Sequence, residues 1–299
     1  MSGDVFRAGF VALVGRPNVG KSTLLNAMLD QKISIVTPKP QTTRHRVLGV
    51  KSTEKYQIIF VDTPGVHDGS NKLMNRSMNR VALNSLEDAD LVVFVVDAKQ
   101  WTTGDDQVCQ RIVAAKKPTI LVCNKIDRIN DKTELLPILD SLAGKLSALC
   151  VVPISALKRD GIDALEKEIA ENIPESQPLY PAETVTDRSN EFLISELIRE
   201  KLTLRLQQEL PYGITVMIEK LEKDEVGLEI AATVLVEKDS QKAIVIGKGG
   251  QLLKQVGRSA RLELKERFQC PVHLSLWVKV KENWSDNARA LESMGFELK

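Results

Sequence analysis

The chain has 299 residues, of which 43% are hydrophobic and 27% charged, and these proportions exclude disordered and fibrous proteins. Its 41 Lys and Arg nearly balance its 40 Asp and Glu, so the net charge of +1 excludes a chain-wide basic field. The length predicts about two domains. Four widely spaced cysteines, with no apolar run near ~18 residues, predict a cytoplasmic protein with reduced thiols.

In the first half, short runs rich in β-branched residues alternate with helix-like segments. This alternation predicts an α/β domain with a mostly parallel sheet and helices on both faces. The expected strands are Phe10–Val14, Tyr56–Val61, Leu91–Asp97, Thr119–Cys123 and Cys150–Ile154. The expected helices are Ser22–Leu29, Lys72–Leu86, Asp105–Ala115, Thr133–Lys145 and Ile162–Asn172.

The pattern breaks at residues 173–187, where Pro174, Pro178 and Pro181 interrupt a polar stretch. We therefore expect a nucleotide-binding domain over residues 1–174, a linker over 175–187 and a second domain over 188–299. The elements expected after the linker are a helix at Asn190–Gln208, strands at Ile214–Lys220 and Gly227–Glu237, a short strand before Val245, a helix at Gln251–Phe268 and a strand at Val272–Val280. Apolar and polar residues alternate along the last strand, which predicts that it is half-buried in a smaller α+β module.

The segment Gly15–Ser22 reads GRPNVGKS and matches the pattern G-x-x-x-x-G-K-[ST] between an expected strand and an expected helix. Glycines let successive N–H groups face phosphate oxygens, and the helix N-terminus adds a positive dipole end. In this pattern Lys21 reaches the β- and γ-phosphates and the Ser22 hydroxyl binds Mg²⁺. The segment therefore predicts a nucleoside triphosphate site.

Three further polar motifs follow successive expected strands: DTPG at Asp62–Gly65, NKID at Asn124–Asp127, and Ser155–Ala156. Each motif is weak by itself, since Asp-Thr-Pro-Gly is commonly a turn. The carboxyl ends of parallel strands, however, meet at one edge of a sheet, where phosphate and Mg²⁺ gather. Together the motifs predict a purine nucleotide site at that edge.

The order of these motifs resembles the small GTPases of the translation-factor class, over roughly the first half of the chain. The resemblance implies that Asp127 accepts hydrogen bonds from guanine, that Asn124 and the N–H of Ala156 frame the base, and that the Lys125 stem packs along it. Adenine lacks the donor pair that Asp127 would bind, so GTP is expected over ATP. The implied nucleotide-binding residues are Gly15, Arg16, Pro17, Asn18, Val19, Gly20, Lys21, Ser22, Thr23, Asp62, Thr63, Pro64, Gly65, Asn124, Lys125, Asp127, Ser155, Ala156 and Leu157.

The polar segment Gln41–Arg44 resembles the first switch of these GTPases. A threonine of that switch binds Mg²⁺ when the γ-phosphate is present; we expect it to be Thr43, with Thr42 as the alternative. Gly65 would donate its backbone N–H to the γ-phosphate from a second switch, Gly65–Lys72. The implied metal ligands are Ser22, Thr43 and Asp62.

The sequence departs from the Ras-like GTPases at Val66. Those proteins carry at this position the glutamine that orients the attacking water. The chain resembles a subgroup in which the loop asparagine, here Asn18, holds K⁺ against the phosphates; the alternative is that Asn18 only stabilises the loop. The residues expected to support catalysis are Lys21, Asn18, Thr43 and Gly65. No arginine finger can be assigned, so slow intrinsic hydrolysis is expected.

In the second half, Gly247–Gly250 reads GKGG, a GxxG loop before the helix Gln251–Phe268. The missing side chains would let a nucleic-acid backbone approach the helix N-terminus. The helix is basic, with Lys254, Arg258, Arg261, Lys265 and Arg267 against Glu263 and Glu266. A flexible turn followed by a solvated basic face is the alternative.

The element order from Arg188 to about Trp284 resembles the type II KH domain, whose GxxG loop clamps about four nucleotides of single-stranded RNA. The resemblance implies that Lys248 meets a phosphate and that Ile244 and Ile246 lie under bases. The implied RNA-binding residues are Ile244, Ile246, Gly247, Lys248, Gly249, Gly250, Lys254 and Arg258.

A GTPase domain followed by one KH domain resembles the bacterial Era-like GTPases. This implies hydrolysis of GTP to GDP and phosphate, coupled to binding of single-stranded RNA near the 3′ end of 16S rRNA during assembly of the small ribosomal subunit. We expect a monomer. One alternative is a membrane-associated cell-cycle GTPase on the cytoplasmic face of the inner membrane, and another is an RNA-binding scaffold with a purely structural nucleotide site.

Overall fold

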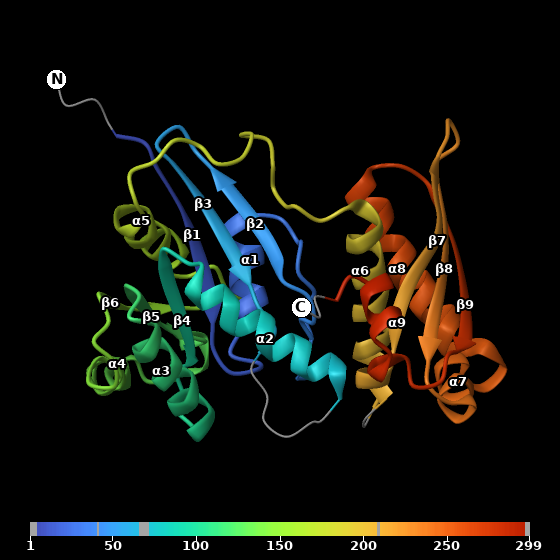
Figure 1. Cartoon of the computed structure of the whole chain (residues 1–299), viewed down its shortest axis with the longest axis horizontal. Coiled ribbons are helices and arrows are strands. Elements are labelled where there is room, and N and C mark those ends of the chain that lie inside the picture. The colour runs from blue at the N-terminus through green and yellow to red at the C-terminus, as the bar shows by residue number, and fades with distance from the viewer. Residues whose placement is uncertain (1–4, 41, 66–71, 208–209, 297–299) are drawn as a thin grey trace. The chain divides into compact units, whose positions relative to one another are not determined.

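The structure, a computed structural model, describes residues 5–40, 42–65, 72–207 and 210–296. The chain forms two compact units (Figure 1). Unit 1 comprises Met1–Ser34, Thr43–Asn71 and Asn75–Asp187, and unit 2 comprises Ile35–Thr42, Lys72–Met74 and Arg188–Lys299. Within the described ranges, no helix is both long enough and apolar enough to cross a membrane.

Unit 1 is built on a six-stranded sheet with the strand order β2-β3-β1-β4-β5-β6. All neighbouring strands pair in parallel except β2, which pairs antiparallel with β3. The strands are β1 (Arg7–Val14), β2 (Val47–Ser52), β3 (Tyr56–Asp62), β4 (Leu91–Asp97), β5 (Thr119–Asn124) and β6 (Cys150–Ile154). The expected mostly parallel sheet is thus confirmed.

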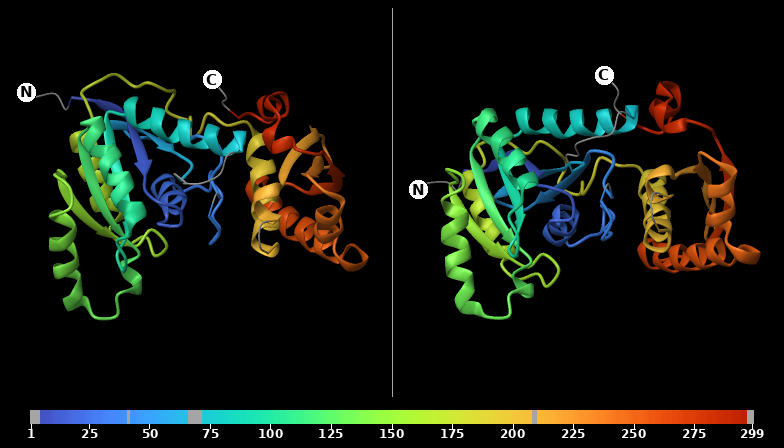
Figure 2. Two further views of the ribbon diagram at one scale, coloured as in Figure 1. Left: turned by 60° about the horizontal axis from the view of Figure 1, so that its bottom comes forward. Right: turned by 90° about the horizontal axis from the view of Figure 1, so that it is seen from below.

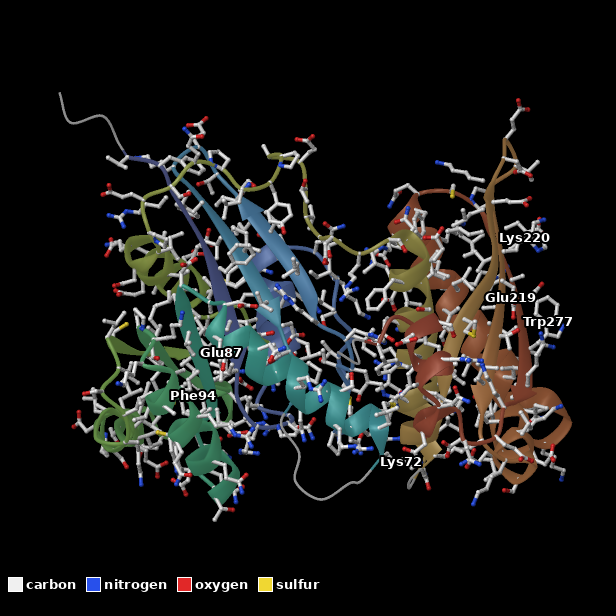
Figure 3. All side chains as sticks on the ribbon, in the orientation of Figure 1. Lys72, Glu87, Phe94, Glu219, Lys220 and Trp277 are labelled. Carbon is white, nitrogen blue, oxygen red and sulfur yellow. The ribbon has the colours of Figure 1, made fainter. Side chains whose placement is uncertain are left out.

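Helices cover both faces of this sheet (Figure 2). They are α1 (Lys21–Leu29), α2 (Leu73–Glu87), α3 (Thr103–Ala115), α4 (Leu135–Ala143) and α5 (Ile162–Asn172). Alternate residues of β4 point to opposite faces, so Phe94 (Figure 3) joins one buried cluster with Val108 and Ile112 of α3. Both faces of β4 are buried, which explains its continuous apolar run.

The sequence analysis missed β2, because Gly49 and Lys51 weaken its strand pattern. Gly49 allows the close packing of α1 on this edge: a Cβ added there would lie 2.5 Å from Leu29 Cδ1. The antiparallel pairing with β3 runs from Val47 opposite Asp62 to Ser52 opposite Gln57. This strand therefore leads from the expected first switch to the start of β3.

Residues 175–187, which we expected to be a linker, bind along the β2–β3 edge within unit 1. The Val50 N–H donates to the Val185 carbonyl at 2.8 Å, and the Thr186 hydroxyl donates to the Leu48 carbonyl at 2.7 Å. The buried Gln57 side chain accepts from the Tyr180 N–H at 2.8 Å and donates to its carbonyl at 2.8 Å. The proline-rich stretch is therefore an extended part of unit 1, since these bonds satisfy its backbone.

Unit 2 contains a three-stranded sheet in the order β7-β8-β9, with β7 antiparallel and β9 parallel to β8. Its elements are α6 (Asn190–Arg205), β7 (Thr215–Lys223), β8 (Leu228–Val236), α7 (Asp239–Ile246), α8 (Gln251–Phe268), β9 (Val272–Val280) and α9 (Ala288–Ser293). Helices α6 and α8 supply Ile198, Leu202, Val256 and Ala260 to the core over this sheet. The α+β module and the bounds of α8 and β9 agree with the sequence prediction.

The predicted alternation along β9 is also present. Val272 and Val278 are buried, whereas Trp277 is 51% exposed and projects from the strand (Figure 3). This half-buried pattern fits a sheet with helices packed on one face.

The short strand expected before Val245 is wrong, because the residues there form the helix α7, which ends at Ile246. The β-branched run favours a strand by propensity. The Gln241 side chain, however, accepts from the N–H groups of Glu237 and Lys238 at 2.8 and 3.2 Å. These backbone N–H groups at the start of the helix therefore have a hydrogen-bond partner. Val245 is fully buried in the core of unit 2, so tertiary packing overrides its strand propensity.

Candidate functional site: a phosphate loop and the motifs around it

The loop between β1 and α1 has the backbone that phosphate binding requires. Gly20 has φ 104°, and a Cβ added there would lie 2.3 Å from Asn124 Nδ2, so only glycine fits. Gly20 is also the N-cap of α1 and offers no side chain to satisfy the first N–H groups of the helix. These N–H groups and the helix dipole make the end of the loop a site for an anion.

Lys21 is buried beneath this loop, with 7% of its surface exposed. Its Nζ donates to the carbonyls of Gly15 and Arg16 at 2.8 and 3.1 Å. Burial lowers the pKa of Lys21 from 10.5 to about 8, against the attraction of the Asp62 carboxylate. An anion bound at the loop would restore charge balance and favour the protonated lysine.

The three expected metal ligands converge. The Ser22 hydroxyl donates to Asp62 Oδ2 at 2.8 Å, and it lies 2.8 Å from the Thr43 hydroxyl. The Thr42 hydroxyl instead pairs with Thr37 at 2.6 Å, so the structure favours Thr43 over Thr42. Ser34, which the sequence analysis missed, also donates to Asp62 Oδ2, at 2.9 Å. No sequence motif marks Ser34.

The Asp62 carboxyl group fits a divalent cation. It is fully buried, and burial raises its pKa, against the effects of Lys21 and of hydrogen bonds from Ser22 and Ser34. Among the described residues, its Oδ1 has no hydrogen-bond partner. Mg²⁺ is commonly held by one or two carboxylates together with hydroxyl groups and substrate phosphates. A buried, unpaired carboxylate oxygen beside two hydroxyls is such a donor set.

The rest of the Asp62–Gly65 motif supports the loop. The Thr63 hydroxyl donates to the Leu13 carbonyl at 3.2 Å and joins β3 to β1. A Cβ added to Gly65 would lie 3.0 Å from Pro17 Cγ, so the backbone of Gly65 lies against the phosphate loop. Residues 66–71 lie outside the described part, and with them Val66 and most of the expected second switch.

The Asn124 side chain bonds to backbone groups of three loops. Its Nδ2 donates to the Val19 carbonyl at 2.8 Å, and its Oδ1 accepts from the N–H groups of Lys125 and Ala156 at 2.7 and 3.0 Å. Asn124 is buried, and its amide connects the phosphate loop with the loops that follow β5 and β6. The Ala156 N–H is likewise bonded to this side chain.

Lys125 and Asp127 lie directly after β5, at the carboxyl edge of the sheet. Asp127 is exposed, and one of its carboxylate oxygens accepts from the Ser155 hydroxyl at 2.5 Å. Lys125 Nζ donates to the Asn18 carbonyl at 2.6 Å and to Asp97 at 2.8 Å. The lysine thereby fixes the guanine motif to the phosphate loop. Leu157 is 72% exposed.

The GxxG loop of unit 2 has an open, left-handed backbone. Gly247, Gly249 and Gly250 have φ values of 75°, 58° and 76°. A Cβ added to Gly249 or Gly250 would meet nothing within 4 Å, so the loop surface is accessible. A groove beside the loop is lined by Gly250, Leu253, Lys254, Gly257, Arg258, Arg261, His273, Leu274 and Leu276.

This groove brings together Gly250, Lys254 and Arg258 from the expected RNA-binding set. Ile244 and Ile246 lie on α7, where Ile244 is 55% exposed and Ile246 packs against the core. The groove therefore has a basic wall on α8 and an apolar floor that includes Leu274 and Leu276 of β9.

Two family models match the chain: "50S ribosome-binding GTPase" over residues 10–125 and "KH domain" over residues 209–285. A relative from Ectopseudomonas mendocina, GTPase Era, is 51% identical over 292 residues that cover 98% of both chains. This chain belongs to the Era family of GTPases. GTPase Era of Pseudomonas fluorescens is 49% identical and covers 97% of both chains. As an Era-family protein, the chain binds GTP and GDP and hydrolyses GTP.

Solved structures of Era proteins agree with the fold along nearly the whole chain. A crystal structure of Era in complex with MgGDPNP and nucleotides 1506–1542 of 16S ribosomal RNA has a TM-score of 0.93 and 40% sequence identity, covering 97% of this chain and 99% of that chain. A single-residue variant of Aquifex aeolicus Era, bound to GDP and AlF4⁻, gives the same scores and coverage. The GTPase-plus-KH architecture predicted from the motifs is confirmed.

Proposed function

We propose that this Era-family GTPase couples its nucleotide state to binding of the 3′ region of 16S rRNA during small-subunit assembly in the cytoplasm. GTP binding and hydrolysis belong to residues 1–174 in this proposal, and RNA binding belongs to residues 188–299. The observation that carries the proposal is the open GxxG loop beside a groove with a basic wall. A relative with the same architecture has been crystallised with that RNA.

At the phosphate site, each residue has a defined role in the proposal. The loop N–H groups and Lys21 hold the phosphates, while Ser22, Thr43 and Asp62 would hold Mg²⁺, which neutralises charge on the phosphate oxygens. Support comes from the convergence of Ser22 and Thr43 at the buried Asp62 carboxylate. Because Thr43 belongs to the first switch, loss of the γ-phosphate would free this segment to change its order.

The coupling has a thermodynamic consequence for RNA binding. If the GTP state favours RNA, then RNA must favour the GTP state by the same factor. We expect an oligonucleotide with the sequence of 16S rRNA nucleotides 1506–1542 to bind more tightly with a non-hydrolysable GTP analogue than with GDP. Fluorescence anisotropy titrations would measure both affinities, and equal values would refute the coupling.

Substitutions in the GxxG loop test the RNA site independently of GTP turnover. Gly249→Asp and Gly250→Asp should each lower RNA affinity at least about tenfold, because a carboxylate repels the phosphates that the loop would contact. The matched control is Gly295→Asp, since Gly295 has φ 81° and similar space around its added Cβ. The control should retain RNA binding, and all three variants should retain GTP turnover. Unchanged RNA affinity in both loop variants would contradict this site.

A potassium requirement is the expected result if Asn18 supports catalysis. Asn18 is exposed at the loop surface with φ 64°, a position from which an oxygen ligand could face the phosphates. Replacing Na⁺ by K⁺ should raise kcat by about tenfold or more, since a fixed cation stabilises charge that develops on the leaving oxygen. Asn18→Ala should abolish this stimulation. Equal turnover in the two salts would exclude the K⁺ role.

A further inference from the structure

A buried carboxylate outside the recognised motifs contacts the phosphate loop. Asp105, in the first turn of α3, is fully buried, and its Oδ2 accepts from Arg16 Nε at 2.9 Å. The same oxygen accepts from the N–H and the hydroxyl of Thr102, each at 2.9 Å. Arg16 also donates from Nη2 to the Gln100 carbonyl at 3.3 Å. The second residue of the phosphate loop is thus attached to the start of α3.

This attachment is difficult to release. A buried charge without its partner is strongly unfavourable, and Arg16 supplies the cation for Asp105. In the part of the chain that the structure describes, Asp105 Oδ1 has no hydrogen-bond partner, so after loss of Arg16 the carboxylate would retain only its bonds to Thr102, which is uncharged. The Thr102 contacts form a capping box, which holds Asp105 itself in one place on α3.

The backbone of Arg16 transmits this restraint to the phosphate site. The Arg16 carbonyl accepts from Lys21 Nζ at 3.1 Å, next to the Gly15 carbonyl at 2.8 Å. Pro17 follows and narrows the backbone conformations open to Arg16. A guanidinium fixed at one end and a carbonyl bonded to Lys21 at the other leave this peptide little freedom to turn.

We propose that Asp105 is a positioning residue for nucleotide binding, which acts through Arg16 to fix the loop carbonyls that align Lys21. The proposal rests on the proposed contact between Lys21 and the phosphates. It assigns α3 a part in the nucleotide site that its sequence does not indicate. Asp105 itself is not expected to touch the nucleotide.

The direction in which one substitution changes nucleotide affinity tests this role. Asp105→Asn keeps an oxygen that can accept from Thr102, but it removes the charge that holds Arg16. Loss of a negative charge near bound phosphates would by itself tighten binding of GDP and of a non-hydrolysable GTP analogue. A positioning role predicts the opposite, a loss of affinity of about tenfold. Titration of the full-length chain with fluorescent derivatives of both nucleotides measures the sign directly.

A matched ion pair elsewhere in unit 1 provides the control. Glu166 is buried, lies 2.7 Å from Lys51 Nζ, and accepts from the Tyr56 hydroxyl at 2.6 Å. Glu166→Gln should lower the melting temperature as Asp105→Asn does, yet leave nucleotide affinity unchanged. In both variants the preference for GTP over ATP should remain, because Asp127 bonds to Ser155 and is part of neither ion pair.

Variants of Arg16 complete the test. Arg16→Gln should weaken binding, and combining it with Asp105→Asn should cost no more than Arg16→Gln alone, since both act through one pair. Arg16→Lys should restore part of the affinity. Unchanged or tighter binding by Asp105→Asn, or additive losses in the double variant, would overturn the proposal. If Lys21→Ala also bound nucleotide normally, the phosphate site itself would be wrong, so the two failures are distinguishable.

Discussion

Replacing Lys21 with alanine should lower the rate of GTP hydrolysis by about 10³-fold, the scale expected when one preorganised charge-stabilising group is lost. Lys21 is the buried cation at the carboxyl edge of the sheet, held by the carbonyls of Gly15 and Arg16. Single-turnover release of phosphate would measure the loss. The matched control is Lys51→Ala, because Lys51 is also partly buried and ion-paired in unit 1, to Glu166. Near-normal hydrolysis by Lys21→Ala would contradict the site.

The pKa of Lys21 adds a pH dependence to this prediction. In the nucleotide-free protein, burial lowers this pKa to about 8, so the ammonium loses its proton as pH rises through that value. Nucleotide phosphates require the charged form, and GDP affinity should therefore fall above about pH 8 by up to about tenfold per pH unit. Lys21→Ala should bind weakly at every pH and should lack this slope. A flat profile in the unchanged protein would show that Lys21 does not contact the phosphates.

The same burial has the opposite effect on folding. In the unfolded chain Lys21 has its ordinary pKa of 10.5, so between about pH 8 and 10.5 the unfolded state binds more protons than the folded state. The free energy of unfolding therefore rises as pH rises through this window, and the destabilising effect of burying Lys21 decreases. In the absence of nucleotide, the cost of burying Lys21 is thus greatest at neutral pH, where the lysine is charged.

The positions of the phosphate-loop motifs can be read from the sequence because these motifs depend on local backbone chemistry. Gly20 must be glycine at φ 104°, while Ser22 lies in the first turn of α1 after β1, and Asp62 ends β3 beside it. The sequence analysis expected Thr43 and kept Thr42 as the alternative, since both are threonines in one polar loop. It depends on which hydroxyl lies within 2.8 Å of Ser22, and this is a tertiary distance.

The features that sequence analysis missed all depend on contacts between distant segments. The edge strand β2 contains Gly49, which is needed for packing on α1, so its strand pattern is weak. Helix α7 contains a β-branched run that alone favours a strand. The helix forms because Gln241 binds the backbone before it and Val245 packs in the core. The proline-rich residues 175–187 resemble a free linker until the partners of Gln57 are known.

Asn124 has contacts within the protein that the family pattern did not indicate. The family pattern indicated an amide that frames the base, whereas the structure uses both ends of the amide to join the phosphate loop to Lys125 and Ala156. Asp127 is the exposed carboxylate of the motif, and we expect it to make the main contribution to the recognition of guanine. Asn124→Ala should then weaken binding of all nucleotides together, because it releases the loops.

Replacing Asp127 with asparagine should change the preferred base from guanine to xanthine. Guanine presents a ring N–H and an exocyclic amine, which are two donors for the two oxygens of a carboxylate. An asparagine offers one acceptor and one donor, so its NH₂ would face the guanine amine without an acceptor between them. Xanthine carries a carbonyl in place of that amine and satisfies both groups. The ratio of GTP to XTP affinity should change by about 10⁴-fold.

Ser155 provides the control that separates base recognition from orientation of the side chain. Its hydroxyl donates to Asp127 Oδ1, and it can donate equally to the oxygen of an asparagine at this position. Ser155→Ala should weaken GTP binding, because the carboxylate loses a fixed orientation, but the preference for GTP over XTP should persist. Competition titrations with GTP, XTP and ATP would measure all three affinities in each variant. If Asp127→Asn kept its preference for GTP, guanine recognition would have to come from other groups, and the NKID motif would serve only to hold the loops together.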